Sequence, residues 1–413
     1  MKFYFPDSQD QVSPLYDFVH DEYADHRVRQ RDDLYAHQAV SPAPYDGILV
    51  SKAIVDGSLK GAGKYSAPQR QRLYRLGARE FFRLPKGMRS LGDCGAFNYV
   101  SEERPPYSVE EVLDFYLGCG FDSGISIDHV IFGYSPKTSD AEVDSSWADR
   151  REISLDLAEE FIAGVNARNA KVVRDEARLE PVGAAQGWSP TSYADSVSHL
   201  QKMGYKRIAL GGMVPLKTPE IVACLQEISK VRAPGVEFHL LGITRVDSME
   251  EFAKYHVGSF DSTSAFRQAF MDERNNYHTA HGAYTAIRVP QVDGNPTLKR
   301  LILAGVVSQS AAIKAERECL RLLRQYDSRD VEAAEVLDAL RSYQALLGDV
   351  KKLKQVERYE ATLADRPWED CPCGLCKKHR IDMVVFRGSE RNKRRGFHNM
   401  TVLEAKMRQL SFA

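Results

Sequence analysis

The sequence has 413 residues, of which 43% are hydrophobic and 27% charged, and this usage is typical of a globular protein with a buried core. Its formal net charge of -1 excludes an overall positive field, so any contact with nucleic acid must rest on local basic patches. The chain has no apolar run long enough for a bilayer and no secretory signal, so we expect a cytoplasmic protein without a membrane partner.

Residues 1–45 are polar and aromatic without a regular period, and we expect them to form an N-terminal arm or cover for the domain that follows. Short apolar runs then alternate with helical patterns as far as residue 261. The expected strands are Gly47–Ser51, Met88–Asp93, Ile125–Phe132, Val182–Gln186, Arg207–Gly212, Phe238–Ile243 and His256–Asp261. The expected helices cover residues 67–83, 109–118, 150–167, 191–203, 218–231 and 247–255.

Strand–helix units repeated this often favour the α/β class, and within it a (β/α)8 TIM barrel over residues 46–307. The alternative is an open doubly wound sheet. That alternative is weakened because neither a G-x-G-x-x-G motif nor a phosphate-binding loop follows the first expected strand.

Polar residues end several of these apolar runs. A barrel carries its catalytic groups at the C-terminal ends of its strands, where the sequence places Asp93, Asp128, Gln186 and Asp261. Three aspartates and a glutamine at one face indicate a site built on carboxylates. The alternative is that strand ends meet polar loops in any fold, with these aspartates capping helices or pairing with arginines.

The pattern changes after residue 261. Residues 262–307 are mixed, with one possible strand at Gly282–Val289. Residues 308–362 repeat apolar side chains at helical spacing and predict an inserted helical hairpin without chemistry of its own, for which Gly348 offers a stop. Residues 363–413 are expected to form a zinc-binding subdomain and a last helix at about 400–411.

Three of the seven cysteines lie within six residues, in a C-x-C-x2-C pattern of Cys371, Cys373 and Cys376. An odd total with a clustered trio indicates a reducing compartment and a metal site, not a disulfide framework. With His398 they make three thiolates and one imidazole, which suit one tetrahedral, structural Zn²⁺ per chain. His379 competes as fourth ligand, but it lies so close in sequence that it would crowd the knuckle.

Basic residues surround the cysteine cluster. The functional interpretation is contact with nucleic-acid phosphates, and the alternative is a solvated surface. The residues concerned are Lys377, Lys378, Arg380, Arg387, Arg391, Lys393, Arg394 and Arg395. A second basic stretch, less specific because aromatic core residues interrupt it, runs from Arg70 to Arg89.

Several segments resemble motifs of the guanine transglycosylases. Asp93-Cys94-Gly95-Ala96-Phe97-Asn98 resembles their Asp-Ser-Gly-Gly/Ala-Phe-Gln, and Asp128 resembles the aspartate with which they read the base. The segment around Asp261 looks like the one that carries their nucleophilic aspartate, closest to the archaeosine-type enzymes. Further similarities are Ala185-Gln186-Gly187 to Val-Gln-Gly, Leu210-Gly211-Gly212-Met213 to Gly-Gly-Leu-Ala, and His239-Leu240-Leu241-Gly242 to Tyr-Leu-Met/Phe-Gly.

The chain also departs from the family's pattern, with cysteine at position 94 and asparagine at position 98. About 110 residues separate Asp261 from Cys371, more than in the bacterial tRNA enzymes, and the family's usual N-terminal segment is not recognisable. We also expect that no RNA-binding domain follows residue 413. This combination most resembles the DNA-guanine transglycosylases, which place a 7-deazaguanine base in DNA, and it implies preQ0 (7-cyano-7-deazaguanine) as incoming base.

The resemblance implies that Asp261 attacks the sugar and that Asp93 is the general acid/base. Asp128 and Gln186 are expected to bind the edge of a guanine-like base, with the backbone at Gly211, Gly212 and Gly242 close to it and Phe97 and Leu241 stacked on its faces. The alternative for Phe97 and Leu241 is an ordinary place in the core.

The preferred function is therefore exchange of guanine for preQ0 in DNA through a covalent aspartyl intermediate. One alternative is the same reaction on tRNA, and another is a non-catalytic, zinc-containing subunit that binds nucleic acid. Retention of both Asp93 and Asp261 argues against the non-catalytic subunit. Expected partners are DNA, the base, a helper protein that opens the duplex and, by family likeness, a second copy of the chain.

Overall fold

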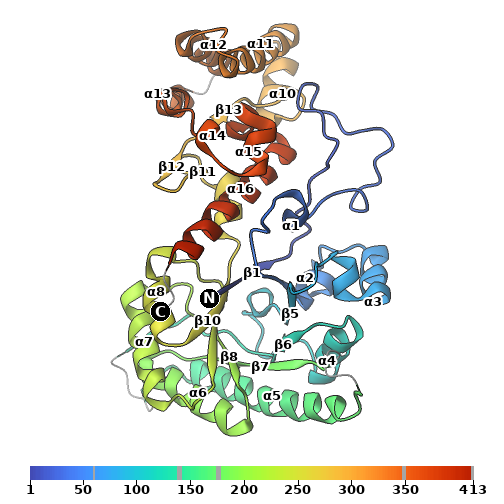
Figure 1. Ribbon diagram of the computed structural model, residues 1–413, viewed down its shortest axis with the longest axis vertical. Helices are drawn as coiled ribbons and strands as arrows, with labels where there is room; N and C mark the ends of the chain where they lie inside the picture. The colour runs from blue at the N-terminus through green and yellow to red at the C-terminus, as the bar shows by residue number, and fades with distance from the viewer. Residues whose placement is uncertain (59–60, 137–141, 174–177, 347–349, 411–413) are drawn as a thin grey trace. The chain divides into compact units, whose positions relative to one another are not determined.

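The computed structural model describes residues 1–58, 61–136, 142–173, 178–346 and 350–410, without side chains at 58, 61, 62 and 350–354 (Figure 1). The chain divides into two compact units. The barrel unit comprises residues 1–9, 45–263 and 407–413, and the second unit comprises residues 10–44 and 264–406.

Eight parallel strands close into a barrel, as predicted. Their order around it is β1-β10-β9-β8-β7-β6-β5-β2. The strands are β1 (Lys2–Pro6), β2 (Gly47–Ser51), β5 (Arg89–Asp93), β6 (Ser123–Ile125), β7 (Glu180–Ala185), β8 (Arg207–Leu210), β9 (Glu237–Leu240) and β10 (Val257–Asp261). Outside them lie α3 (Ala67–Phe81), α4 (Val109–Gly118), α5 (Ser145–Asn169), α6 (Pro190–Met203), α7 (Thr218–Val231) and α8 (Met249–Lys254). The short elements of this unit are α2 (Lys52–Asp56), β3 (Gly57–Ser58), β4 (Gly61–Ala62), η1 (Ala96–Asn98) and η3 (Val246–Ser248).

The barrel interior holds a packed apolar core. Its central cluster contains one side chain or more from six strands, which is how parallel barrels bury their strands. The ring of Tyr116 of α4 packs directly on the backbone of β5 and β6. It can do so because Gly92 and Gly124 have no Cβ, which at either position would collide with the ring. The buried cluster is Tyr4, Leu49, Leu91, Ile125, Val182, Ala184 and Ala209.

Strand β1 corrects the expectation of an arm over residues 1–45. Tyr4 pairs in register with Gly47 of β2 on one side and with Asp261 of β10 on the other, so these first residues complete the barrel. The buried side chains of Phe3, Tyr4 and Phe5 explain the placement, because three consecutive aromatics suit a strand covered on both faces.

The expected strand at Ile125–Phe132 is also shorter than predicted, since β6 ends at Ile125. Beyond it, the backbone N–H of Ile131 donates to the side-chain oxygen of Gln186 at 3.2 Å and not to a neighbouring strand. A side chain thus replaces the strand ladder at this point, and the apolar character of the segment reflects burial alone.

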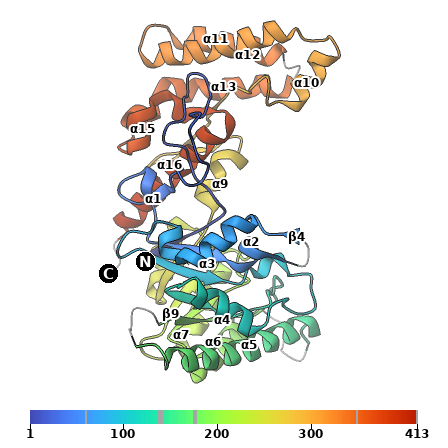
Figure 2. The same ribbon diagram turned by 90° about the vertical axis from the view of Figure 1, so that its right-hand side faces the viewer.

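In the second unit, helices α11 (Gln309–Asp327) and α12 (Ala333–Leu346) lie side by side in both views (Figures 1 and 2). The predicted hairpin is incomplete, because a third helix, α13 (Val350–Asp365), follows; Gly348 lies outside the described residues. The expected strand at 282–289 is two separate pieces, β12 (Ala283–Tyr284) and β13 (Ile287–Arg288).

The last helix, α16 (Gly388–Gln409), begins well before the predicted residue 400 and therefore carries His398. Among the described residues, no helix combines the length and the apolar character needed to cross a membrane. The remaining elements of the second unit are α1 (Ala36–Ala39), α9 (Ser264–Met271), β11 (Tyr277–His278), α10 (Pro296–Leu303), α14 (Pro367–Asp370), α15 (Gly374–His379), η4 (Arg380–Val384) and β14 (Val385–Phe386).

Candidate active site and metal centre

The four polar residues predicted at strand ends all lie at the C-terminal face of the barrel. Asp93 is the last residue of β5 and Asp261 the last of β10. Gln186 directly follows β7, and Asp128 comes three residues after β6. The C-terminal ends of parallel barrel strands lie at one face, which we call the rim, so these four segments far apart in sequence meet there.

Asp128 and Gln186 form a buried pair. The Gln186 side-chain amide donates to Asp128 Oδ2 at 2.5 Å, and its oxygen accepts the Ile131 N–H described above. These two contacts fix which end of the amide faces the carboxylate. Gly211 lies against the same amide, where a Cβ would collide with it, and Gly212 has a φ of 72° that favours glycine.

Burial gives two of the carboxyl groups unusual proton affinities. Burial raises the pKa of Asp93 to about 7, and the negative charges of Asp128 and then Asp261 add to the rise. Burial also raises the pKa of Asp128 to about 6, against the hydrogen bond from Gln186, which lowers it. Asp93, although its side chain is partly exposed, can therefore both give and take a proton near neutral pH.

Asp261 is buried and accepts two hydrogen bonds on one oxygen. His239 Nε2 lies 3.1 Å from Oδ1, and the backbone N–H of Gly242 donates to the same oxygen at 3.0 Å. His239 Nδ1 lies 2.9 Å from the Ser259 hydroxyl. Sequence reasoning did not assign His239 a role. Its position two residues before Leu241 indicates that both side chains face the same side of the chain, and β9 lies beside β10.

The two expected stacking residues differ in their surroundings. Leu241 is partly buried against the barrel core, whereas the Phe97 side chain is 54% exposed. The Phe97 ring contacts Phe132, with 5.2 Å between ring centroids, and sequence reasoning did not single out Phe132. Arg150 links the segment after Phe97 to the segment before Phe132, because its guanidinium donates to the carbonyls of Val100 and Val130.

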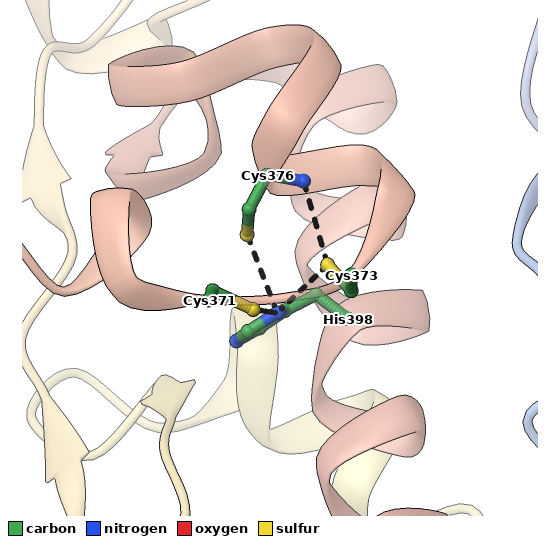
Figure 3. Close-up of side chains that lie close together, drawn as sticks. All are labelled: Cys371, Cys373, Cys376 and His398. Carbon is green, nitrogen blue, oxygen red and sulfur yellow. Dashed lines mark hydrogen bonds between the residues drawn. The ribbon is translucent and has the colours of Figure 1, made fainter.

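The four predicted metal ligands gather in the second unit (Figure 3). Cys371, Cys373 and Cys376 Sγ lie 3.4 to 3.5 Å from His398 Nδ1, and all four ligand atoms lie within 4.8 Å of one another. A tetrahedral ion with ordinary metal–sulfur and metal–nitrogen bonds needs an S···N separation of roughly 3.6 Å. The group therefore fits a single metal ion.

Surrounding groups orient these ligands. His398 Nε2 lies 2.8 Å from the carbonyl of His278, to which it donates, so Nδ1 is left with a lone pair for an ion. Tyr277 stacks on the same imidazole at 4.2 Å between centroids. His379, the competing fourth ligand, lies instead against Phe18 at 4.7 Å and is not part of the group.

Comparisons with known proteins bear on the family to which the chain belongs. No model of a known protein family matches the sequence. A protein named DNA-guanine transglycosylase from Salmonella montevideo is 46% identical over 407 residues, which cover 98% of this chain and 95% of that protein. The chain belongs to the DNA-guanine transglycosylase family. It is therefore an enzyme of the guanine transglycosylase class, as its motifs predicted.

The structure overturns half of the eight predicted phosphate contacts in this transglycosylase. Four of the basic residues are at most 6% exposed: Arg387, Arg391, Arg394 and Arg395. Arg391 pairs with Asp21 and Asp382, and Arg394 pairs with Glu390.

The other two buried arginines are also engaged within the second unit. Arg387 pairs with Asp21 and Glu316, and Arg395 donates to backbone carbonyls at Ala269 and Val385. Lys393 lies 3.8 Å from Asp10. Lys377 and Lys378 remain exposed. Arg380 is exposed as well, but it pairs with Asp327 and Glu369. Lys377 and Lys378 therefore keep a surface position suited to phosphate.

Proposed function

We propose that this enzyme replaces guanine in DNA by preQ0 through a covalent bond between Asp261 and the sugar. The observation that carries the proposal is the arrangement at the barrel rim. A buried carboxylate held by donors on one oxygen lies on the same face as Asp93, whose pKa is near 7, and as the Asp128–Gln186 pair. This set contains a nucleophile, a proton carrier and a base-binding pair.

The first step breaks the bond between the sugar C1′ and N9 of guanine. Asp261 attacks C1′ through one carboxylate oxygen, and the electron pair of the C1′–N9 bond passes to the departing base. The protonated form of Asp93 gives its proton to that base. Because this form declines as pH rises through about 7, we expect the departure of guanine to slow above neutral pH.

The second step reverses the first with a different base. Ionised Asp93 takes a proton from the incoming base, whose ring nitrogen attacks C1′ and displaces the Asp261 carboxylate. The strand is never cut, because the sugar stays bound to the enzyme between the two steps. The exchange needs neither ATP nor a redox cofactor at this centre.

Asp128 and Gln186 support recognition of a guanine-like base. An ionised carboxylate accepts hydrogen bonds from the N1–H and 2-amino group, which guanine and 7-deazaguanines share. Gly211 and Gly212 have no side chain, so the backbone can approach the ring of the base. A side chain at Gly211 would also collide with the Gln186 amide. Phe97 is proposed to stack on the bound base from the rim.

DNA is proposed as the substrate because the Salmonella protein of similar sequence bears the name DNA-guanine transglycosylase. A base within a duplex must leave the stack before C1′ can be attacked, so a helper protein that opens DNA is compatible with the proposal. The cysteine–histidine group is proposed to hold a structural Zn²⁺, whose four protein ligands leave no position for water. Reduced thiolates of this kind suit the cytoplasm.

The proposal is tested by incubating the enzyme with radiolabelled preQ0 and, in parallel, guanine-containing single-stranded DNA, duplex DNA and tRNA. We expect label in DNA, first in the single strand, and none with Asp261→Asn, whose amide is a poor nucleophile. Metal content should be the same in both proteins. Label in tRNA alone would refute the choice of DNA, and label with Asp261→Asn would refute the nucleophile.

A further inference from the structure

We propose that His239 positions the nucleophile, so that a defined oxygen of Asp261 faces the sugar. This inference rests on the proposed function and adds a residue to it. The imidazole is 1% exposed and lies on β9 beside β10, where His239 is the register partner of Ser259. It contacts both Ser259 and Asp261, which are two residues apart on β10 and therefore face the same side of the strand.

The hydrogen bonds determine where the imidazole carries its proton. An ionised carboxylate only accepts hydrogen bonds, so the Nε2 that faces Asp261 must carry the hydrogen. In the neutral imidazole Nδ1 is then an acceptor, and the Ser259 hydroxyl donates to it. The ring of Tyr4 meets the imidazole edge-on at 5.9 Å and limits its rotation. Ser259 thus sets the tautomer through which His239 holds Asp261.

The two oxygens of Asp261 are consequently not equivalent. Both the His239 imidazole and the Gly242 N–H donate to Oδ1, whereas Oδ2 accepts no hydrogen bond from any described residue. Oδ2 therefore keeps its lone pairs for attack at C1′. When the ester forms, Oδ1 becomes its carbonyl oxygen and keeps the same two donors, so the carboxylate need not rotate between the two steps.

Histidine is suited to this place because its ring has two nitrogens on opposite sides. One nitrogen reaches Ser259 while the other reaches Asp261, and neither contact requires solvent. We therefore assign to this chain a Ser259–His239–Asp261 arrangement in which His239 never touches the substrate.

Three substitutions separate the two contacts. His239→Gln keeps an N–H near the position of Nε2, His239→Asn reaches only the position of Nδ1, and His239→Phe keeps the ring without either nitrogen. The measured quantity is the single-turnover rate at which the protein forms a covalent adduct with a guanine-containing DNA oligonucleotide, read on a denaturing gel. The dissociation constant for preQ0 is measured in parallel, because a merely structural defect would change it too.

We expect His239→Asn and His239→Phe to form the adduct about tenfold to 100-fold more slowly, the range for a hydrogen bond to a charged group. His239→Gln should restore the rate to within about fivefold of wild type. The preQ0 dissociation constant should change by less than about twofold in all three, because Asp128 and Gln186 are untouched. Ser259→Ala, which leaves the imidazole in place, should slow adduct formation by a smaller factor.

The inference is wrong if His239→Phe and Ser259→Ala both form the adduct at the wild-type rate while Asp261→Asn forms none. It is also wrong if rate and preQ0 affinity fall together in every variant, because that outcome marks a structural role. If the wild-type enzyme forms no adduct with any nucleic acid, the proposed function itself fails, and this inference falls with it.

Discussion

At the scale of single residues, Asp93 at the C-terminal face of the barrel lowers the stability of the folded protein near neutral pH. Asp93 lies near two other carboxylates, Asp128 and Asp261, and burial raises its pKa to about 7. A carboxyl that ionises near pH 4 in the unfolded chain and near pH 7 in the folded protein favours folding only at low pH. Stability from this group is full below about pH 4 and is lost as pH rises toward 7.

Asp93→Asn should therefore stabilise the protein increasingly as the pH rises. Between pH 5 and pH 8 we expect the gain in unfolding free energy over wild type to grow by roughly 2 kcal/mol, allowing for partial exposure. Thermal melts of both proteins at several pH values measure it, with base exchange abolished in the variant. A constant difference across this range would mean that Asp93 is not held near neutrality by its neighbours.

At the scale of elements, the basic residues of α15, of α16 and of the segment between them are of two kinds that the sequence does not distinguish. All of them were predicted to contact phosphate, yet four arginines are buried and bonded to carboxylates or carbonyls within the protein. Some of their partners, such as Asp21, lie far away in sequence, and spacing along one helix cannot reveal them. The motif at Asp93 was readable because its whole signal lies in six consecutive residues.

The strands, too, were predictable only where the signal is local in the sequence. Gly47–Ser51 was predicted with its observed ends, because an apolar run between polar segments marks a buried strand. Residues 2–6 were missed because the run is short, stands at the chain end and is followed by a long irregular segment. His239 was missed as well, since its partners Ser259 and Asp261 become neighbours only when β9 and β10 pair.

Arg391→Ala should lower stability by about 3 to 5 kcal/mol, because it leaves carboxylates buried without their partner. The matched control replaces exposed Lys377 and Lys378 by alanine. That double variant should melt like wild type, but the slope of log affinity for DNA against log salt should flatten by up to about 2. If Arg391→Ala melts like wild type and flattens the salt slope instead, the buried ion pairs do not exist in solution.

At the scale of the whole molecule, the four candidate metal ligands and the aspartates proposed as catalytic belong to different units. We expect a strong chelator, or Cys376→Ser, to lower the calorimetric transition of the second unit while preQ0 binding by the barrel unit persists. Metal analysis and calorimetry on the same samples provide the measurement. Loss of preQ0 binding together with the metal would show that the ion supports the base site directly.

Strand β1 also bears on how the enzyme is made. Residues Lys2–Pro6 pair with the last barrel strand, Tyr4 beside Asp261, so the barrel can close only after residue 261 has been synthesised. Unless β1 is in place, β10 has an open edge, and Asp261, the proposed nucleophile, is the last residue of that strand. An affinity tag fused directly before Lys2, or deletion of Lys2–Pro6, would thus disturb the strand that lies beside Asp261. These five residues should be left unaltered when the enzyme is produced.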